Sequence, residues 1–355
     1  MSINTNPEMN ETQTPIRIIR SRTPVRICDN GGWTDTWFAG HGAVFNIAVK
    51  PGIEIEMKIY PRAGKHWQAA VHSNHFGDLV LPYNGTKKDP RFDLLEAIIT
   101  YAKIPDDISV EIYIRSDVPP GSATGTSAAA AVALLGAFEM LHGCEVRKHE
   151  IAYKAHDVET RLLGQQSGIQ DQLCASYGGV NFIEIPGYPN AVVHQLNLSE
   201  RVLHDLGERL VLIYLGTAHS SSAIHENVIR ELQSAGPECE QLQALRRAAI
   251  DSRDAVLAGN MEKLGIAMRN NTEAQGRLHP ALVSVEARKI IAIAEQYGAL
   301  GWKVNGAGGE GGSLTLLAGE RKSEMIHAIE TADARVKNIP LMIDPEGLAV
   351  SEVEQ

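Results

Sequence analysis

The sequence predicts an α+β protein of two domains. The segment "GIEIEMKIY" (52–60) alternates apolar and charged residues, which is the period of an antiparallel strand with one buried face. The second half of the chain is mostly helical, and strands and helices do not alternate regularly, which argues against a parallel βαβ sheet. The length of 355 residues is enough for about two domains of ordinary size.

The first half of the chain combines strands, a glycine-rich loop and helices. Residues 1–14 are polar and are expected to form a disordered tail. The alternating and apolar runs predict strands at 17–27, 42–49 and 52–60, with the glycine-rich loop "CDNGGWTDTWFAGHG" at 28–42. Expected next are a helix at 93–104, a strand at 108–117, a helix at 128–141 ending at Gly143, a helical stretch at 148–163 and a helix within 168–179.

The second half begins with the apolar run "ERLVLIYLGT" (208–217), which predicts a buried strand. We place the domain boundary just before it, near 195–208, so that the domains span 15–200 and 201–355. The expected elements are helices at 223–234, 238–258, 260–275 and 282–299, a loop at 305–312, a strand at 313–318, a further helix and a last strand at 339–347.

Composition narrows the possible partners. The formal net charge of −10 disfavours nucleic acid, whose binding depends on neutralising phosphates. No window is long and apolar enough to span a bilayer, and the N-terminus has no apolar signal segment, so no membrane partner is expected. The cysteines are scattered without a CxxC pair, which favours reduced thiols in the cytoplasm; they are Cys28, Cys144, Cys174 and Cys239.

The segment "PPGSATGTSAA" (119–129) joins a predicted strand to an alanine-rich helix. Its small residues allow an anion to approach several backbone N–H groups, and the helix N-terminus adds its dipole. The candidate nucleotide-binding residues are Pro120, Gly121, Ser122, Ala123, Thr124, Gly125, Thr126 and Ser127. The alternative is a tight corner beneath a closely packed helix, and no Gly-Lys-Ser/Thr of the P-loop follows the glycines.

Two carboxylates and a second glycine-rich loop could complete such a site. Asp171 lies in "GIQDQ" at the start of a predicted helix, and Glu159 lies on the helical segment before it. Phosphoryl transfer can use one carboxylate as a base and another as a metal ligand. Taken singly, each carboxylate is better explained as a solvated acid, and the glycine loop of "KVNGAGGEGGS" (303–313) is explained as an ordinary turn.

Together these segments resemble the GHMP kinase superfamily. "RTPVRICDNGGWTD", "PPGSATGTSAA" and "KVNGAGGEGGS" are similar to its first, second and third motifs, and "GIQDQ" to its catalytic-aspartate segment, all in the superfamily's order. The sugar-kinase branch that contains heptose (heptose-phosphate) and fucose kinases is the most similar. It shares a "GG-x-T/S-D" loop, here 31–35, and a "GG-x-N" turn, here 178–181.

The resemblance implies a fold, cofactors and residue roles. The fold would be an N-terminal domain like domain 2 of ribosomal protein S5 and a ferredoxin-like α+β C-terminal domain. ATP and Mg²⁺ would bind, with Ser127 and Glu159 holding the metal. Asp171 would be the catalytic base, with Arg26 beside it. The implied substrate-binding residues are Gly32, Thr34, Asp35, Gly306, Gly308 and Gly309. Asp35 has an alternative role as a helix N-cap after the glycine turn.

The function that the resemblance implies is transfer of the γ-phosphate of ATP to a small-molecule sugar. The expected acceptor is a mannoheptose or its 7-phosphate, at the anomeric hydroxyl. The alternatives are a fucose or galactose 1-kinase, a mevalonate-type kinase, or a non-catalytic sensor. A monomer or homodimer is expected.

The sequence departs from the family's pattern in three places. Glu310 interrupts the third glycine run, and Trp302 replaces a small residue. The segment "GTAHSSSAIHENV" (216–228) lacks an arginine often found there, which weakens the case for a phosphorylated acceptor. His219 or His225 is either a substitute substrate contact or a solvated loop residue. Trp37 is expected in the core or beside the adenine.

Overall fold

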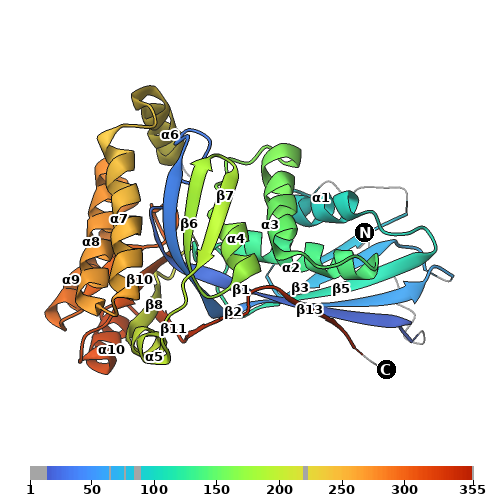
Figure 1. Cartoon of the computed structure of the whole chain (residues 1–355). Coiled ribbons are helices and arrows are strands. Elements are labelled where there is room, and N and C mark those ends of the chain that lie inside the picture. Colours follow the sequence, from blue (N-terminus) through green and yellow to red (C-terminus); the bar gives the residue numbers. More distant parts are fainter. Residues whose placement is uncertain (1–13, 64, 76, 84–88, 219–222, 354–355) are drawn as a thin grey trace, which may run out of the picture.

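The protein consists of two β-sheets with helices packed on them (Figure 1). The computed structural model describes residues 14–63, 65–75, 77–83, 89–218 and 223–353. The predicted tail lies outside these ranges except for its last residue. Within the described ranges, no helix combines the length and apolar character needed to cross a bilayer.

The larger sheet has nine strands, and its main path runs β13-β1-β2-β5-β3-β4. Its pairs are antiparallel except β3 with β5, as the alternating pattern of 52–60 predicts. Its strands are β1 (Arg17–Asn30), β2 (Gly42–Pro61), β3 (Ala69–Ser73), β4 (Gly77–Leu81), β5 (Ile108–Ser116), β6 (Val180–Gly187), β7 (Asn190–Gln195), β12 (Met342–Ile343) and β13 (Ala349–Glu352).

Strand β2 is one long strand, whereas the sequence predicts two separate strands at 42–49 and 52–60. Its first part pairs with β6 and β12 and its second part with β5, so it changes neighbours near Lys50. The register against β1 shifts between Thr23 and Val25. Gly52 lies where the strand changes neighbours, and a Cβ there would lie 2.0 Å from the Thr23 carbonyl oxygen. The close approach of the two strands therefore requires glycine at this position.

Helices α1–α4 lie over one face of the large sheet in Figure 1, with α2 against β1 and β2. The alanines of α2 let the helix approach the sheet closely: Ser21 Oγ donates to the Ala133 carbonyl at 2.6 Å and Thr23 Oγ1 to that of Ala129 at 2.9 Å. These helical segments are η1 (Pro90–Phe92), α1 (Asp93–Ala102), α2 (Thr126–Leu141), α3 (Lys148–Asp157), the π-turn η2 (Val158–Leu162) and α4 (Gln170–Tyr177).

The smaller sheet is antiparallel with the order β11-β8-β10-β9, and some of the helices of the second half pack against it. Its strands are β8 (Leu210–Tyr214), β9 (Gly301–Val304), β10 (Ser313–Leu317) and β11 (Lys337–Ile339). The helices are α5 (Glu200–Arg209), α6 (Ala223–Ala235), α7 (Glu240–Leu257), α8 (Met261–Leu278), η3 (Pro280–Leu282), α9 (Val285–Gln296) and α10 (Lys322–Ala332).

The C-terminal segment returns to the large sheet. Strand β13 pairs with β1 over four residues of each strand, and β12 pairs with β2. Leu348 is buried and its side chain packs at Gly136 of α2, where a Cβ would come within 3.0 Å. Residues 342–352 therefore belong structurally with the first sheet, a return that a single cut at residue 200 does not include. In place of the predicted last strand at 339–347 there are two short strands, β11 and β12. Strand β11 pairs with β8 in the smaller sheet, and β12 pairs with β2 in the larger sheet.

Several elements are absent from the sequence prediction. Helix α5 occupies most of the segment expected to join the domains, with Ser199 accepting a hydrogen bond from the Val202 N–H as its N-cap. Strands β3, β4, β6 and β7 were also not predicted from the sequence.

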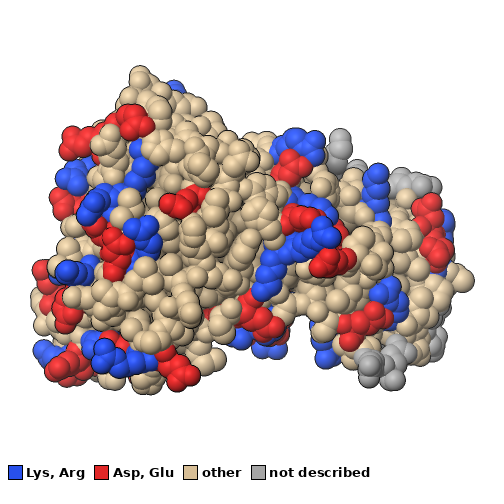
Figure 2. All heavy atoms as spheres, in the orientation of Figure 1, with Lys and Arg blue, Asp and Glu red and all other residues tan. Residues whose placement is uncertain are grey.

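On the face shown in Figure 2, basic and acidic side chains are interspersed.

Candidate active site

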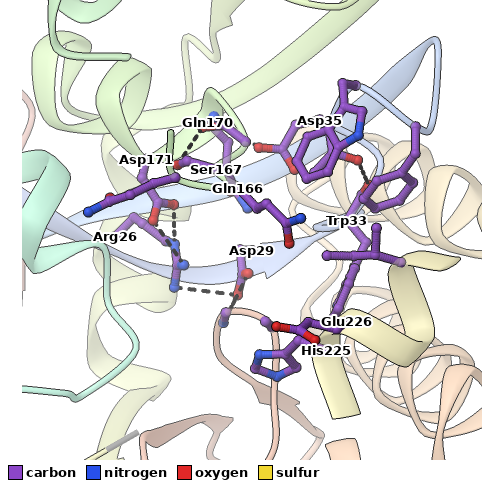
Figure 3. A pocket seen from close by; sticks show the side chains of 18 residues that line it. Arg26, Asp29, Trp33, Asp35, Gln166, Ser167, Gln170, Asp171, His225 and Glu226 are labelled. Atoms are coloured by element: carbon purple, nitrogen blue, oxygen red, sulfur yellow. Dashed lines mark hydrogen bonds and ion pairs between the residues drawn. The ribbon is translucent and has the colours of Figure 1, made fainter. Parts of the chain in front are cut away.

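A cavity of about 740 Å³ lies where β1, the loop before α4, helix α6 and the β9–β10 loop meet (Figure 3). Its polar wall combines carboxylates with side-chain amides, and its other wall is aromatic and aliphatic. The lining residues that matter below are Arg26, Asp29, Trp33, Asp35, Trp37, Phe38, Gln165, Gln166, Ser167, Gly168, Asp171, His225, Glu226, Ile229 and Gly306.

Arg26 and Asp171 form a bidentate ion pair at one side of the cavity. Nε of Arg26 donates to Oδ1 of Asp171 at 2.7 Å and Nη2 donates to Oδ2 at 3.2 Å (Figure 3). Burial would lower the pKa of Arg26, but the charges of Asp171 and Asp29 outweigh it and raise that pKa, so the guanidinium stays charged. The Asp171 side chain remains 24% exposed, which leaves it accessible from the cavity.

Asp29 connects Arg26 to the glycine loop after β9. Its carboxylate lies 3.9 Å from Arg26 Nη1 and 3.2 Å from Lys303 Nζ, and it accepts the Gly306 N–H at 3.0 Å. Lys303 is almost completely buried, which lowers its pKa, while the charge of Asp29 opposes that shift. The two cations, Arg26 and Lys303, and the two carboxylates, Asp29 and Asp171, form a network of balanced charge.

The segment 119–126 folds as the tight turn that precedes α2. Gly121, Ala123 and Gly125 have φ values of 70°, 58° and 71°, so the backbone is in the left-handed region at each of them. Gly125 is the N-cap of α2 and has no side chain with which to cap it, so the first N–H groups of a 16-residue helix have no side-chain cap. Such a helix start, in a loop without bulky side chains, fits a phosphate group.

Hydrogen bonds hold the 119–126 turn against the rest of the site. Ser313 Oγ donates to the Ser122 carbonyl at 2.6 Å, and Arg26 donates to the Ala123 carbonyl. The Asp171 carboxyl lies directly against the loop, because a Cβ at Gly125 would come within 3.0 Å of its Cγ. The carboxylate therefore lies between the 119–126 turn and the cavity.

Asp35 lies on the other side of the cavity and is buried. Oδ2 accepts the Gln170 N–H at 3.1 Å, at the first residue of α4, so Asp35 supports the N-terminus of a helix that is distant in sequence. Burial raises the pKa of Asp35 to about 6, and this hydrogen bond opposes that shift. Gly168 is required beside it, since a Cβ there would lie 2.0 Å from Oδ2.

Glu159 and Ser127 are the predicted oxygen ligands, and neither lines the cavity. Ser127 is exposed in the first turn of α2. Glu159 is buried in η2, where it accepts hydrogen bonds from Ser167 Oγ at 3.1 Å and Gln172 Nε2 at 2.6 Å. Burial raises the pKa of Glu159 to about 7, the charge of Asp171 adds to the shift, and the two hydrogen bonds oppose it.

Several predicted substrate contacts do not line the cavity. Thr34 is fully buried and its hydroxyl bonds the backbone of Gly31 and Ala43, so it holds the loop instead of facing a ligand. Gly32 packs on Asp29, and Gly308 and Gly309 pack on Leu282. Gly306 does line the cavity. Glu310 is exposed and lies outside the lining, so it adds no charge there.

His225, one of the two histidines considered as a substrate contact, does line the cavity, within an aromatic wall that was not predicted from the sequence. Trp33, Trp37 and Phe38 line it together with His225 and Ile229 of α6. The rings of Trp33 and His225 meet edge to face with centroids 5.8 Å apart, and the His225 ring bonds the Gly308 carbonyl at 2.9 Å. The loop and the helix are 190 residues apart in sequence, so no local pattern signals their contact. His219 lies outside the described residues.

Family comparisons agree with this arrangement. The model described as "GHMP kinases N terminal domain" matches residues 93–179, and "GHMP kinases C terminal" matches 252–332. Mevalonate kinase of Pyrococcus horikoshii is 30% identical over 345 residues, which cover 90% of this chain and 96% of that protein. The chain belongs to the GHMP kinase family. It is therefore an ATP-dependent small-molecule kinase that phosphorylates an alcohol group.

Two further relatives bear on this GHMP kinase. The D-glycero-alpha-D-manno-heptose 7-phosphate kinase of Campylobacter jejuni is 25% identical over 336 residues, covering 91% of this chain and 96% of the relative. The solved D-glycero-D-manno-heptose 1-phosphate kinase of Bacteroides thetaiotaomicron superposes with a TM-score of 0.73 at 20% identity. That superposition covers 95% of this chain and all of the other, and it confirms the predicted two-part GHMP kinase fold.

Proposed function

We propose that this protein transfers the γ-phosphate of ATP to a hydroxyl group of a sugar. The observation that supports the proposal best is the position of Asp171, which Arg26 holds between the 119–126 turn and the polar cavity. The proposed acceptor is a heptose, free or as its 7-phosphate, phosphorylated at the anomeric hydroxyl. The similarity to the heptose 7-phosphate kinase of Campylobacter jejuni supports a heptose.

The residues that would bind ATP and Mg²⁺ are those that the resemblance to the family implies. The backbone and hydroxyl groups of 120–127 would cradle the nucleotide phosphates, because the loop lacks bulk and ends at an uncapped helix start. Ser127 and Glu159 would hold Mg²⁺ through oxygen atoms, which this cation prefers. When bound, ATP supplies the phosphoryl group and Mg²⁺ offsets the phosphate charge.

The chemical step needs a positioned base and charge stabilisation. Asp171 would accept the proton of the acceptor hydroxyl as its oxygen bonds to the γ-phosphorus and ADP departs. Arg26 would orient the Asp171 carboxylate through its bidentate contact and stabilise charge on the transferring group. Asp29 and Lys303 would fix Arg26 from behind without touching the reacting atoms.

The cavity favours a polyol over mevalonate. Asp35, Gln165, Gln166 and Ser167 offer acceptors and donors to several hydroxyl groups at once, while mevalonate presents its own carboxylate. A non-catalytic sensor is disfavoured, because Asp171, Arg26, Glu159 and Ser127 are all present. We also propose that the enzyme works in the cytoplasm as a monomer or homodimer.

A substrate panel tests the proposal. Purified protein with ATP and Mg²⁺ is assayed for ADP release with mannoheptose, its 7-phosphate, fucose, galactose, mannose and mevalonate, and ³¹P NMR locates the new phosphate. Turnover of a sugar with an anomeric phosphate as product is expected. Turnover of mevalonate alone would contradict the proposal, and ATP binding without any turnover would favour the sensor.

A further inference from the structure

The acceptor cavity is acidic. Four of its described lining residues are carboxylates, namely Asp29, Asp35, Asp171 and Glu226, and one, Arg26, is a permanent cation. We propose that the acceptor is a sugar without a phosphate group and that Glu226, with Asp35, excludes phosphorylated sugars. This inference rests on the proposed function and narrows its acceptor.

The single cation is already engaged. Arg26 directs Nε and Nη2 to Asp171, gives Nη1 to the Ala123 carbonyl, and lies 3.9 Å from Asp29. Lys303 is the other nearby cation, but only 1% of its side chain is exposed, and it contacts Asp29 and Gln275 instead of lining the cavity. The described wall therefore offers no uncommitted positive group with which to hold a second phosphate.

The remaining charge is negative. Because Arg26 and Lys303 balance Asp29 and Asp171, Asp35 and Glu226 remain, and no Lys, Arg or His lies within ion-pair distance of either in the described chain. Glu226 is exposed to the cavity from the first turn of α6, beside the aromatic wall (Figure 3). A phosphate brought there would meet a like charge, which is a common means of rejecting a wrong ligand.

Hydrogen-bonding chemistry gives the same result. An ionised carboxylate only accepts hydrogen bonds, so it pairs with sugar hydroxyls, which can donate. The oxygens of a phosphate dianion are also acceptors and cannot pair with it. The nucleotide phosphates have a different environment, the N–H groups at the start of α2, which lie outside the described lining of the cavity.

Matched pairs of acceptors test the proposal. Mannoheptose with its 7-phosphate, and galactose with its 6-phosphate, are assayed at equal concentration with ATP and Mg²⁺. The products are resolved by ³¹P NMR, and binding of each acceptor is measured by calorimetry with a non-hydrolysable ATP analogue. We expect kcat/KM to be at least about 100-fold lower for the phosphorylated member of the pair that is used.

Variants that replace one glutamate by glutamine test whether Glu226 is the residue that excludes phosphorylated sugars. Glu226→Gln should raise the relative kcat/KM for the phosphorylated sugar about tenfold. Glu231→Gln, an exposed residue of the same helix outside the cavity, should leave the ratio unchanged. A wild-type preference for the sugar phosphate would overturn the inference but leave the sugar kinase intact. An unchanged ratio in Glu226→Gln would overturn the role of Glu226, and absence of both binding and turnover with any sugar would overturn the proposed function as well.

Discussion

At Asp35, the requirements of substrate binding and of protein stability conflict, because its carboxyl group is buried. Its pKa is raised from 3.8 to about 6, so ionisation at neutral pH costs the folded protein free energy. Asp35→Asn should therefore stabilise the unliganded protein at pH 7.5 by about 1–3 kcal/mol. The same change should raise the KM for the sugar about tenfold or more, because a negatively charged hydrogen-bond acceptor is lost. Chemical unfolding and steady-state kinetics measure the two effects.

The pH dependence of this gain has a definite sign. The stability that protonated Asp35 gives is complete below pH 3.8 and is lost as the pH rises through about 6. The advantage of Asp35→Asn should thus be full above about pH 6 and should fade below pH 4. A stability difference that stays constant across this range would show that Asp35 does not carry the shift.

Motif membership predicted side-chain direction poorly at single residues. Arg26, Asp35, Asp171 and Gly306 line the cavity, but Thr34 from the same loop turns its hydroxyl to the backbone. The backbone of this loop has positive φ values at Gly31 and Trp33, so neighbouring side chains do not alternate regularly in direction. No periodic pattern in the sequence predicts where each of them points. The site roles of 120–127, Glu159 and Ser127 stay predictions.

At the scale of elements, Asp29 links β1 to β9. Asp29→Asn should destabilise the fold by about 3–5 kcal/mol, since it leaves Lys303 buried without its counter-charge. The double variant Asp29→Asn/Lys303→Met should recover part of that loss, because it removes both charges. Urea unfolding of the wild type, of Asp29→Asn, of Lys303→Met and of the double variant measures the coupling, and additive losses would contradict it.

Elements with a clear period were predicted, and elements defined by distant partners were not. Helices α7, α8 and α9 follow the predicted segments closely, because each carries a long amphipathic pattern. The continuity of β2 was missed because Pro51 and Gly52 are locally typical of a break, whereas the strand pairs with β1 on both sides of them. Helix α5 was missed because polar residues of this short helix resemble a linker.

At the scale of the whole molecule, the last strand joins the end of the chain to its beginning. Leu348, beside β13, is buried against α2, so Leu348→Ala should lower the free energy of unfolding by about 2–4 kcal/mol. The exposed Ser351→Ala in β13 should change it by less than about 0.5 kcal/mol. Equal stability of the two variants in urea would show that the returning segment does not support the large sheet.

The two-sheet α+β architecture was predictable because the family's motifs follow one another along the chain. The return of 342–352 to the first sheet was not, since its strands are short and carry no alternating pattern long enough to identify. The cavity was predictable only in part, because its aromatic wall arises from packing α6 on the glycine-rich loop.

The position of Asp171 is the centre of this account, and one variant tests it most directly. Asp171→Asn keeps the size of the side chain and removes its ability to accept the acceptor proton. With the sugar that the wild type uses, kcat should fall about 100-fold or more while the Kd for ATP, measured by calorimetry, stays within about threefold. Near-full turnover by this variant would contradict the assignment of Asp171 as the catalytic base.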